Sequence, residues 1–232
     1  MGNTVRTTDR RTSVDEVYDY LHEQITTLGL RPGDKISEAD MATRFGISRQ
    51  PVRDAFSRLA NLDLLLIRPQ RATEVKRFSM REIEKSRFVR ASIEMEVLRR
   101  AAARCDANGA ARMNAAIEDQ RNAIQDRNVD GFGALDYEFH KTLCEIAGVD
   151  FAFDVIMSEK AKVDRLCRLG LSKEQRLPDL MEDHKRIADA IKAHDGTQAV
   201  EAGMFHLSRL DETIERITAT NANYFEPVDT LT

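Results

Sequence analysis

The sequence contains few of the features that mark secreted or membrane proteins. Its three cysteines share no CxxC spacing and are odd in number, which fits neither a disulfide framework nor a zinc ribbon. No run approaches the roughly 18 apolar residues of a membrane span, and the first residues, MGNTVRTTDRRTS, lack the apolar core of a signal peptide. We therefore expect a cytoplasmic protein that does not contact a membrane.

The composition is that of a folded protein with more than one domain. Of the 232 residues, 42% are hydrophobic and 32% are charged, so there is enough apolar material to bury a core. The length suits a small domain joined to a larger one, and two domains are expected.

Positive charge is concentrated in one part of the chain, although the whole chain has a net charge of -4. Residues 44–77 hold eight Lys or Arg and three Asp or Glu, an excess of five positive charges. Residues 1–43 hold five against eight, and residues 79–232 hold 22 against 28. A basic block of this kind attracts DNA phosphates, but a solvated helix face has the same charge, so charge alone leaves both interpretations open.

The periodicity of the first 77 residues predicts a winged helix-turn-helix. Apolar residues spaced by three and four indicate a first helix, which we expect Gly29 to end. A second helix stops at Gly46 and a third begins at once with Ser48 as N-cap, which is the spacing of a helix-turn-helix. Two β-like runs around a turn predict the wing. The expected elements are helices over 13–28, 37–45 and from 48 onward, and strands over 64–67 and 73–75.

From residue 78 onward the sequence predicts only helices. Ser79 and Glu82 have the spacing of a capping box, and breaks at glycine and at Asn-Gly or Asp-Gly pairs divide the rest. The predicted fold class is therefore mainly α, with a winged helix-turn-helix over 1–77 and an antiparallel helical bundle over 78–232. The expected helices of the bundle cover 79–105, 107–127, 130–147, 151–169, 174–194 and 196–219.

The helix after Ser48 carries side chains suited to reading DNA. Arg49 and Arg53 are four residues apart and share one face, and Gln50 lies beside them. Arginine can donate two hydrogen bonds to guanine, glutamine can pair with adenine, and the N-terminal residues of a recognition helix meet base edges. Arg71 at the wing tip is a candidate for phosphate or minor-groove contact. Weaker phosphate candidates are Arg44, Arg58 and Arg68.

A second group of residues has the spacing of metal ligands. Asp136 and His140 are four residues apart on one expected helix, within reach of one metal ion. His184 and His206 fall on two later helices. A single histidine is more often a core or surface residue than a ligand, so the residues alone do not choose among the five histidines of the chain.

The segment LRPGDKISEADMATRFGISRQPVRDAFSRLANLDLL resembles the signature of the GntR family of bacterial transcription factors. That family shares a PG loop, an LA-rich second helix and an SRxPVR recognition helix. The resemblance implies that Arg49, Gln50 and Arg53 face operator bases and that residues near Arg71 form the wing.

The segments LDYEFHKTLCEIAG and EDHKRIADAIKAHDGTQAVEAGMFHLSRL are similar to the all-helical, FCD-type ligand-binding domain of the FadR-like branch of that family. In its metal-binding members four side chains hold one divalent ion. The resemblance places these ligands at Asp136, His140, His184 and His206. It implies one metal ion per chain, zinc before nickel, manganese or iron, with coordination positions left open for a carboxylate metabolite.

Arg90 and Cys144 each have two interpretations. Arg90 matches a family arginine that could bind the negative charge of an effector through paired hydrogen bonds, or it could form a salt bridge with Glu94 or Glu84. Cys144 lies four residues beyond His140, so it is either a thiolate near the metal, which would favour zinc, or a small core residue.

Three positions depart from the family pattern. Ala72 stands where a glycine is usual at the wing tip, and Asn61-Leu62-Asp63 replaces a turn that commonly contains glycine. Val149 follows Gly148 where an asparagine is common, so we expect a pocket that differs in shape or in ligand.

The resemblance implies a homodimer that presents two recognition helices to double-stranded operator DNA. It also implies repression that is relieved by a small organic acid, such as a sugar acid or another carboxylate. One alternative is a DNA-binding regulator in which the metal is purely structural. Another is a metal-dependent enzyme, because three histidines and an aspartate could activate water, but no HExxH or nucleophile motif supports it. We therefore expect a regulator and not an enzyme.

Overall fold

The computed structural model describes residues 12–167 and 173–227, which form two compact units. The first unit contains residues 12–78 together with 223–227, and the second contains residues 79–222 apart from the gap. The sequence grouped every residue after 77 with the second domain, whereas residues 223–227 cluster with the first unit. None of the described helices is long and apolar enough to cross a membrane.

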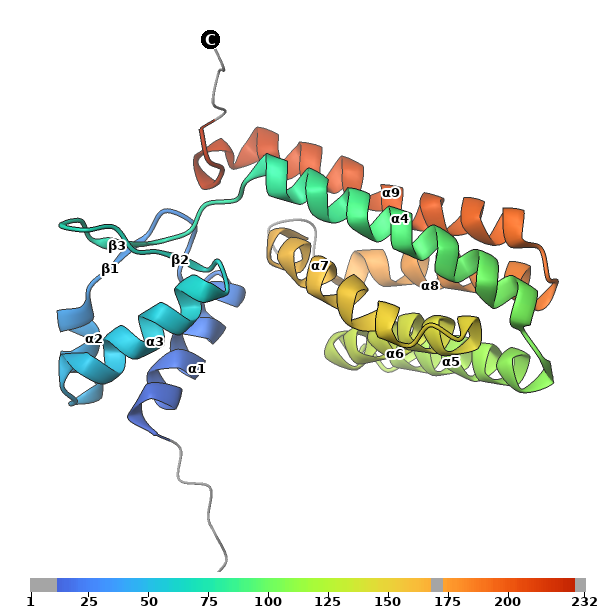
Figure 1. Cartoon of the computed structure of the whole chain (residues 1–232), viewed down its shortest axis with the longest axis horizontal. Coiled ribbons are helices and arrows are strands. Elements are labelled where there is room, and N and C mark those ends of the chain that lie inside the picture. The colour runs from blue at the N-terminus through green and yellow to red at the C-terminus, as the bar shows by residue number, and fades with distance from the viewer. Residues whose placement is uncertain (1–11, 168–172, 228–232) are drawn as a thin grey trace, which may run out of the picture. The chain divides into compact units, whose positions relative to one another are not determined.

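The first unit is a winged helix-turn-helix, as the sequence predicted (Figure 1). Helix α1 begins after Thr12, which forms a reciprocal capping box with Asp15. Helix α2 ends at Gly46, which has a φ of 65° and takes the left-handed conformation of a helix C-cap. The elements of this unit are α1 (Ser13–Thr26), β1 (Lys35–Ile36), α2 (Glu38–Phe45), α3 (Arg49–Asn61), β2 (Leu65–Leu66) and β3 (Thr73–Val75).

Helices α1 and α2 pack against α3, and the three helices share one apolar core with a small antiparallel sheet of order β1-β3-β2. Strand β1 was not predicted. It is two residues long, with Lys35 opposite Glu74 and Ile36 opposite Thr73, so its sequence is too short to show a period of two. The core of the unit contains Val17, Leu21, Ile25, Val52, Phe56, Leu59 and Val75.

Three residues other than glycine take the left-handed conformation at the ends of elements in this unit. Helix α1 ends at Thr26 and Leu28 has a φ of 65°, so the prediction that the helix runs to Leu28 and is ended by Gly29 was wrong. Asp63 after α3 has a φ of 61°, and Gln70 in the wing turn has a φ of 59°. The positive φ of the wing turn therefore falls on Gln70 and not on Ala72, the position at which the family commonly has glycine.

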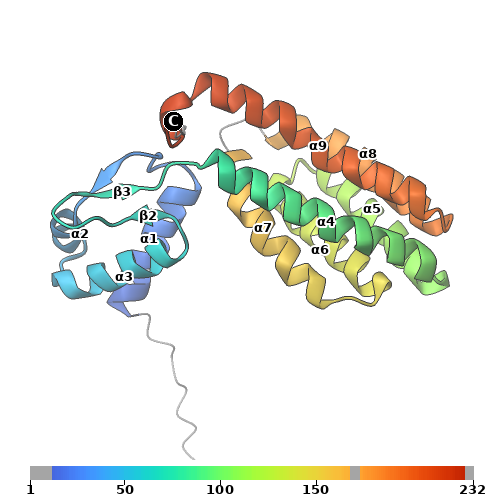
Figure 2. The ribbon, with the colours of Figure 1, turned by 45° about the horizontal axis from the view of Figure 1, so that its top comes forward.

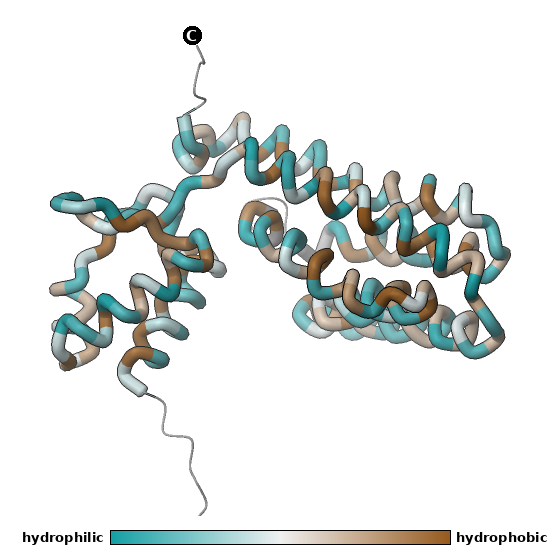
Figure 3. The backbone as a smooth tube through the Cα atoms, viewed as in Figure 1, coloured by the Kyte–Doolittle hydropathy of each residue, from teal (hydrophilic) through white to brown (hydrophobic). Residues whose placement is uncertain are grey.

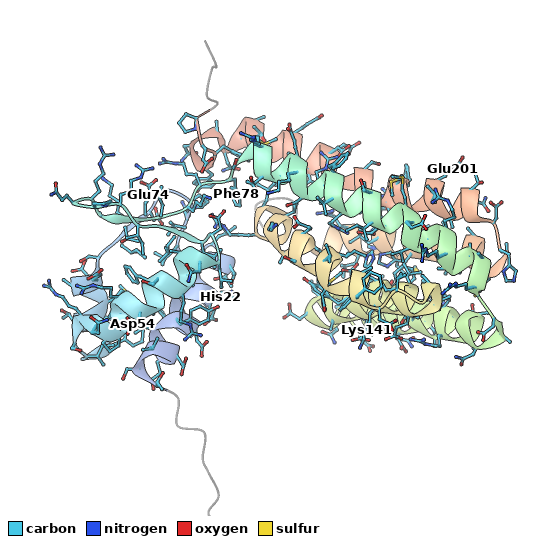
Figure 4. All side chains as sticks on the ribbon, viewed as in Figure 1. His22, Asp54, Glu74, Phe78, Lys141 and Glu201 are labelled. Carbon is cyan, nitrogen blue, oxygen red and sulfur yellow. The ribbon has the colours of Figure 1, made fainter. Side chains whose placement is uncertain are left out.

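The C-terminal segment pairs with the chain just after the wing. Phe78 donates its backbone N–H to the carbonyl of Tyr224 at 2.9 Å, and Glu226 donates to the carbonyl of Phe78 at 2.8 Å, which makes a parallel bridge between Phe78 and Phe225. The two phenylalanine rings lie 5.6 Å apart, and both side chains are buried. Figure 4 labels Phe78 on the segment that leaves β3. Residues 223–227 thus form part of the unit that begins at the N-terminus.

The second unit is the predicted bundle of six helices. The two longest, α4 and α9, run side by side in both ribbon views (Figures 1 and 2). Pro178 lies inside α8, near its start. The helices are α4 (Met80–Arg104), α5 (Ala107–Gln125), α6 (Val129–Ala147), α7 (Phe151–Cys167), α8 (Lys173–Lys192) and α9 (Gly196–Thr220).

Apolar residues at helical spacing hold the bundle together, and they appear as brown stretches along its helices in Figure 3. Helix α6 packs against α4, α5, α7 and α8, and its buried face runs through Phe132, Asp136, Phe139, His140 and Leu143. Polar side chains therefore interrupt an otherwise apolar stripe. Lys141, next in sequence to His140, points to the exposed side of the same helix (Figure 4).

Candidate functional site

Helix α3 presents one buried and one exposed face. Its apolar side chains are fully buried in the core, whereas Arg49, Gln50 and Arg53 are exposed. Arg53 Nη2 lies 3.2 Å from Glu38 Oε2, and Gln50 Nε2 donates to Asp54 Oδ1 at 2.9 Å (Figure 4 labels Asp54). The predicted base-reading residues therefore share an exposed face, and two of them have acidic partners that DNA would have to replace.

The other predicted DNA-contacting arginines have different surroundings. Arg58 lies 4.1 Å above the ring of Tyr18 and forms an ion pair of 2.8 Å with Asp15. Hydrogen bonds from the Thr12 hydroxyl and then from Arg58 hold the pKa of Asp15 at about 2. Arg44 lies 4.4 Å above the ring of Tyr20, and Arg71 is exposed in the wing turn. Arg71 thus points into solvent, whereas Arg44 and Arg58 also pack on α1.

Three histidines from three helices meet inside the second unit. His140 comes from α6, His184 from α8 and His206 from α9, and one ligand nitrogen of each lies within 4.8 Å of the others. All three side chains are buried, His184 completely. The ring of Phe139 stacks on His184 with centroids 4.3 Å apart, which fixes the plane of that imidazole.

Asp136 completes the group that the sequence predicted. Its Oδ1 lies 3.5 Å from His184 Nε2 and 4.0 Å from His140 Nε2. Its other oxygen lies 3.3 Å from Lys160 Nζ on α7. The spacing of four residues between Asp136 and His140 does place both side chains on one face of α6. The structure therefore brings together all four residues that the resemblance selected.

An outer ring of oxygen atoms faces the Nδ1 atoms of the three imidazoles. His184 Nδ1 lies 2.8 Å from Gln120 Oε1, whose amide nitrogen in turn donates to the carbonyl of Leu135. His140 Nδ1 lies 3.6 Å from Glu94 Oε2, and His206 Nδ1 lies 3.8 Å from Asp183 Oδ2. Partners of this kind orient metal-binding histidines and select their tautomer. Sequence reasoning named Glu94 only as a partner of Arg90, and it missed Gln120 and Asp183, because residues on other helices carry no spacing signal.

Arginines neutralise the two carboxylates of the outer ring. Arg90 binds Glu94 through Nε at 2.9 Å and Nη2 at 2.8 Å, and both side chains are buried. Arg209 binds Asp183 through Nε at 2.6 Å and Nη2 at 3.0 Å. The predicted salt bridge between Arg90 and Glu94 is therefore present, but it is buried beside the histidines instead of exposed.

The protonation states of the group suit a metal ion. Burial lowers the pKa of His140 to about 3, although the charge of Asp136 opposes this, and it lowers the pKa of His184 well below its usual value. Burial alone would raise the pKa of Asp136, but its pKa is lowered, with the charge of Lys160 as the largest opposing cause, and the carboxyl stays ionised. At neutral pH, His140 and His184 are therefore neutral and Asp136 is anionic.

Two of the inner nitrogens lack a hydrogen bond. Nε2 of His140 and Nε2 of His184 are buried and have no hydrogen-bond partner among the described residues. A buried polar atom without a partner costs free energy, and an absent ligand is a common reason for one. The residues present therefore fit a divalent ion held by three imidazoles and one carboxylate.

Cys144 does not add a thiolate to this group. Burial raises the pKa of its thiol to about 12, and the side chain packs into the core of the bundle with Leu143, Ala147 and Leu98. The interpretation of Cys144 as a small core residue is therefore the one that the structure supports.

A pocket of about 190 Å³ opens beside the histidines, and Asp136 and His206 form part of its wall. Arg90, Lys160 and Arg176 also line it, so three cationic side chains surround the space. Most of the remaining wall is apolar. The pocket thus joins a metal-competent group to a positively charged cavity, as in a site for a small anion.

An exposed basic helix on a winged helix-turn-helix, joined to a separate helical bundle, is the arrangement of a DNA-binding transcription regulator. The comparison with known proteins agrees: residues 13–75 match the bacterial regulatory proteins of the gntR family, and residues 87–209 match the FCD domain. The chain belongs to the GntR family and carries an FCD domain. It is a DNA-binding transcriptional regulator and not an enzyme.

Relatives resemble the chain over most of its length. The transcriptional repressor RspR of Escherichia coli K12 is 34% identical over 210 residues, which cover 90% of this chain and 92% of that protein. A probable D-xylose utilization operon transcriptional repressor of Paenarthrobacter nicotinovorans is 27% identical, with coverage of 90% and 91%. In the solved structure of Escherichia coli McbR/YncC, the fold matches with a TM-score of 0.63 at 16% identity, covering 89% of this chain and 99% of that one.

Proposed function

We propose that this regulator is a repressor that dissociates from operator DNA when a small carboxylate binds at a divalent metal ion. The observation that carries the proposal is the group of three buried histidines with Asp136, which borders a cationic pocket and in which Nε2 of His140 and Nε2 of His184 lack a hydrogen-bond partner. A repressor is proposed because RspR and the Paenarthrobacter relative bear that name.

The metal ligands in this proposal are Asp136, His140, His184 and His206. Nitrogen donors with one carboxylate suit zinc, and also nickel, manganese or iron, whereas calcium and magnesium prefer oxygen ligands. The bound ion would supply a positive centre with open coordination positions, which attracts a carboxylate group. Gln120 holds the proton of His184 on Nδ1, and this leaves the lone pair of Nε2 directed inward.

The effector would lie in the pocket beside the metal. Arg90 and Lys160 stand at the end formed by Asp136 and His206, where they would bind the same negative charge. Because Arg90 already pairs with Glu94 through two hydrogen bonds, its guanidinium is held in place before the effector arrives. This assigns Arg90 an effector-binding role in addition to its salt bridge.

DNA contact is assigned to the exposed face of α3 and to the wing. Arg49, Gln50 and Arg53 would read base edges, and Arg71 would contact phosphate or the minor groove. Arg44 and Arg58 would contribute to phosphate attraction only weakly, since both pack on tyrosine rings of α1. A homodimer would present two such faces to the half-sites of a near-palindromic operator.

Release of DNA requires that the effector bind one geometry of the dimer better than the other.

The test measures affinity for the DNA upstream of the protein's own gene, with and without a panel of carboxylates, and the metal content of the purified protein. We expect salt-sensitive specific binding, about one metal ion per chain, and at least one acid that weakens DNA binding.

The double variant His184→Ala/His206→Ala should lose the metal and the response, whereas His22→Ala, which lies in the other unit, should keep the metal. Full metal occupancy in the double variant would refute the site. A metal-dependent melting temperature without any effect of acids on DNA affinity would instead identify a structural ion.

A further inference from the structure

We infer that the effector is a carboxylic acid with an apolar carbon body and not a polyhydroxylated sugar acid, which the resemblance gave as one example. This inference rests on the proposed function. The basis is the set of side chains that line the pocket, taken in order of their distance from Asp136 and the three histidines.

The pocket runs away from the histidines along three helices. On α6 the lining residues other than Tyr137 and Asp136 itself lie on the N-terminal side of Asp136, and Phe132 is one turn and Val129 about two turns away. With a rise of about 1.5 Å per residue, these positions are roughly 6 and 10 Å from Asp136 along the helix axis. On α8 the lining residues likewise precede His184, beginning with Leu180. The effector therefore has a charged end at Asp136 and a body that extends along the bundle.

The wall around that body offers apolar side chains and few hydrogen-bonding groups. Tyr137 is the single uncharged side chain with a hydroxyl or amide among the described residues that line the pocket, and it already lies 4.8 Å under Lys160. Three lining residues are cationic: Arg90 and Lys160 have ion-pair partners, Glu94 and Asp136, and Arg176 lies eight residues before His184 on α8. The apolar wall consists of Val129, Phe132, Leu177, Leu180, Leu207 and Leu210.

This wall discriminates between two kinds of acid. A hydroxyl group moved from water into apolar surroundings loses its hydrogen bonds and finds no partner there, which opposes binding. A methylene group in the same place gains from burial, and each one tightens binding about fourfold, or about 0.8 kcal/mol. The volume of about 190 Å³ corresponds to roughly six water molecules, so the body is short.

The test uses the zinc-loaded full-length protein and titration calorimetry with two acids, heptanoate and threonate. Each has one carboxylate and the same number of non-hydrogen atoms, but threonate carries three hydroxyl groups where heptanoate has methylenes. We expect heptanoate to bind at least tenfold more tightly, and affinity to rise about fourfold per methylene from butyrate to hexanoate. Threonate that binds as tightly as heptanoate, or a series without dependence on length, would overturn the inference.

Variants locate the effect in the pocket. Leu180→Asn should weaken heptanoate binding at least fivefold while zinc content is unchanged, and Leu207→Asn gives a second measurement on another helix if the first variant does not fold. The matched control Leu62→Asn changes an exposed leucine of the other unit and should leave the affinity as it was. Equal loss in the control, or none in either pocket variant, would refute the assignment of the wall.

The outcomes separate this inference from the proposal beneath it. If threonate binds the zinc-loaded protein tightly and weakens DNA binding, the carboxylate sensor stands and the apolar ligand is refuted. If the protein holds zinc but binds none of the acids, both are refuted and the metal is structural. If the protein holds no zinc at all, the proposal of a metal-dependent sensor is refuted. The acids are then titrated against the metal-free protein, and tighter binding of heptanoate than of threonate would still support an effector with an apolar body.

Discussion

Replacing Gln120 should weaken metal binding although Gln120 would not touch the metal. Its side chain is fully buried, and its Oε1 accepts from His184 Nδ1 at 2.8 Å. In Gln120→Leu that acceptor is gone, so the proton of the neutral imidazole moves to Nε2, where Asp136 Oδ1 lies 3.5 Å away. The metal-free protein then has a hydrogen bond to a carboxylate that metal binding must break.

The magnitude follows from that competing hydrogen bond. A hydrogen bond to a charged group contributes about 1.5–3 kcal/mol, which corresponds to roughly a 10- to 100-fold loss of affinity for zinc. Gln120→Glu keeps an acceptor facing Nδ1 and should retain the affinity. Gln125→Leu makes the same substitution at an exposed position of the same helix and serves as the matched control.

The assay is a competition titration of metal-free protein with zinc and a chromophoric chelator at pH 7.5. Circular dichroism of each variant checks that the bundle is folded. If Gln120→Leu binds zinc within about twofold of the wild type, Gln120 does not select the tautomer of His184 and the reasoning is refuted.

Three further predictions concern the DNA-binding face, the wing and the pH dependence of stability. Arg53→Ala should weaken binding to operator DNA by about 1–3 kcal/mol and reduce discrimination against random DNA, whereas Arg58→Ala should keep the discrimination. Fluorescence anisotropy measures both, and equal discrimination in wild type and Arg53→Ala would refute the assignment of Arg53 as a base-reading residue. Gln70→Gly should relieve the left-handed conformation of the wing turn and raise the free energy of unfolding by about 0.5–1 kcal/mol in calorimetry, with Gln70→Ala giving no gain; a gain in both would point to another cause. In the folded protein the pKa values of His140 and His184 lie below the usual 6.5, so below about pH 6.5 the unfolded chain binds more protons than the folded chain. The free energy of unfolding is therefore highest above about pH 6.5 and falls as the pH decreases toward 3. From pH 7 to 5.5 the two groups together should cost about 2.5 kcal/mol in urea unfolding of the metal-free protein, and a double variant with glutamine at both positions should lose this slope.

Much of the fold was predictable because its elements are amphipathic and end at recognisable residues. The six helices of the bundle begin and end within about two residues of the expected positions, apart from the last part of 151–169, which lies outside the described residues. Helix α3 was placed by Ser48, which stands at the N-cap position of the helix. Where local signals are absent, prediction failed: β1 has two residues, and the end of α1 was assigned to a glycine although Leu28 takes the left-handed conformation.

The candidate site was predictable only in part, for a similar reason. The spacing of Asp136 and His140 along one helix is visible in the sequence, but the choice of His184 and His206 required a resemblance to a family. Gln120 and Asp183 face these histidines from other positions in the bundle, and the sequence around each of them gives no sign of this contact. Contacts between helices depend on packing, which a period of 3.6 residues does not encode.

The pairing of Phe78 with Phe225 has a consequence for how the chain is made. The residues that complete the DNA-binding unit leave the ribosome well after the rest of that unit, because about 145 residues separate Phe78 from Asn223. At roughly 5–20 residues per second, the wing side of that unit exists for about 7–30 seconds without its final segment. During synthesis, Phe78 therefore lacks its contact with Phe225 after the helices and sheet of its unit have been synthesised, and the contact forms only when the chain has been made as far as Phe225.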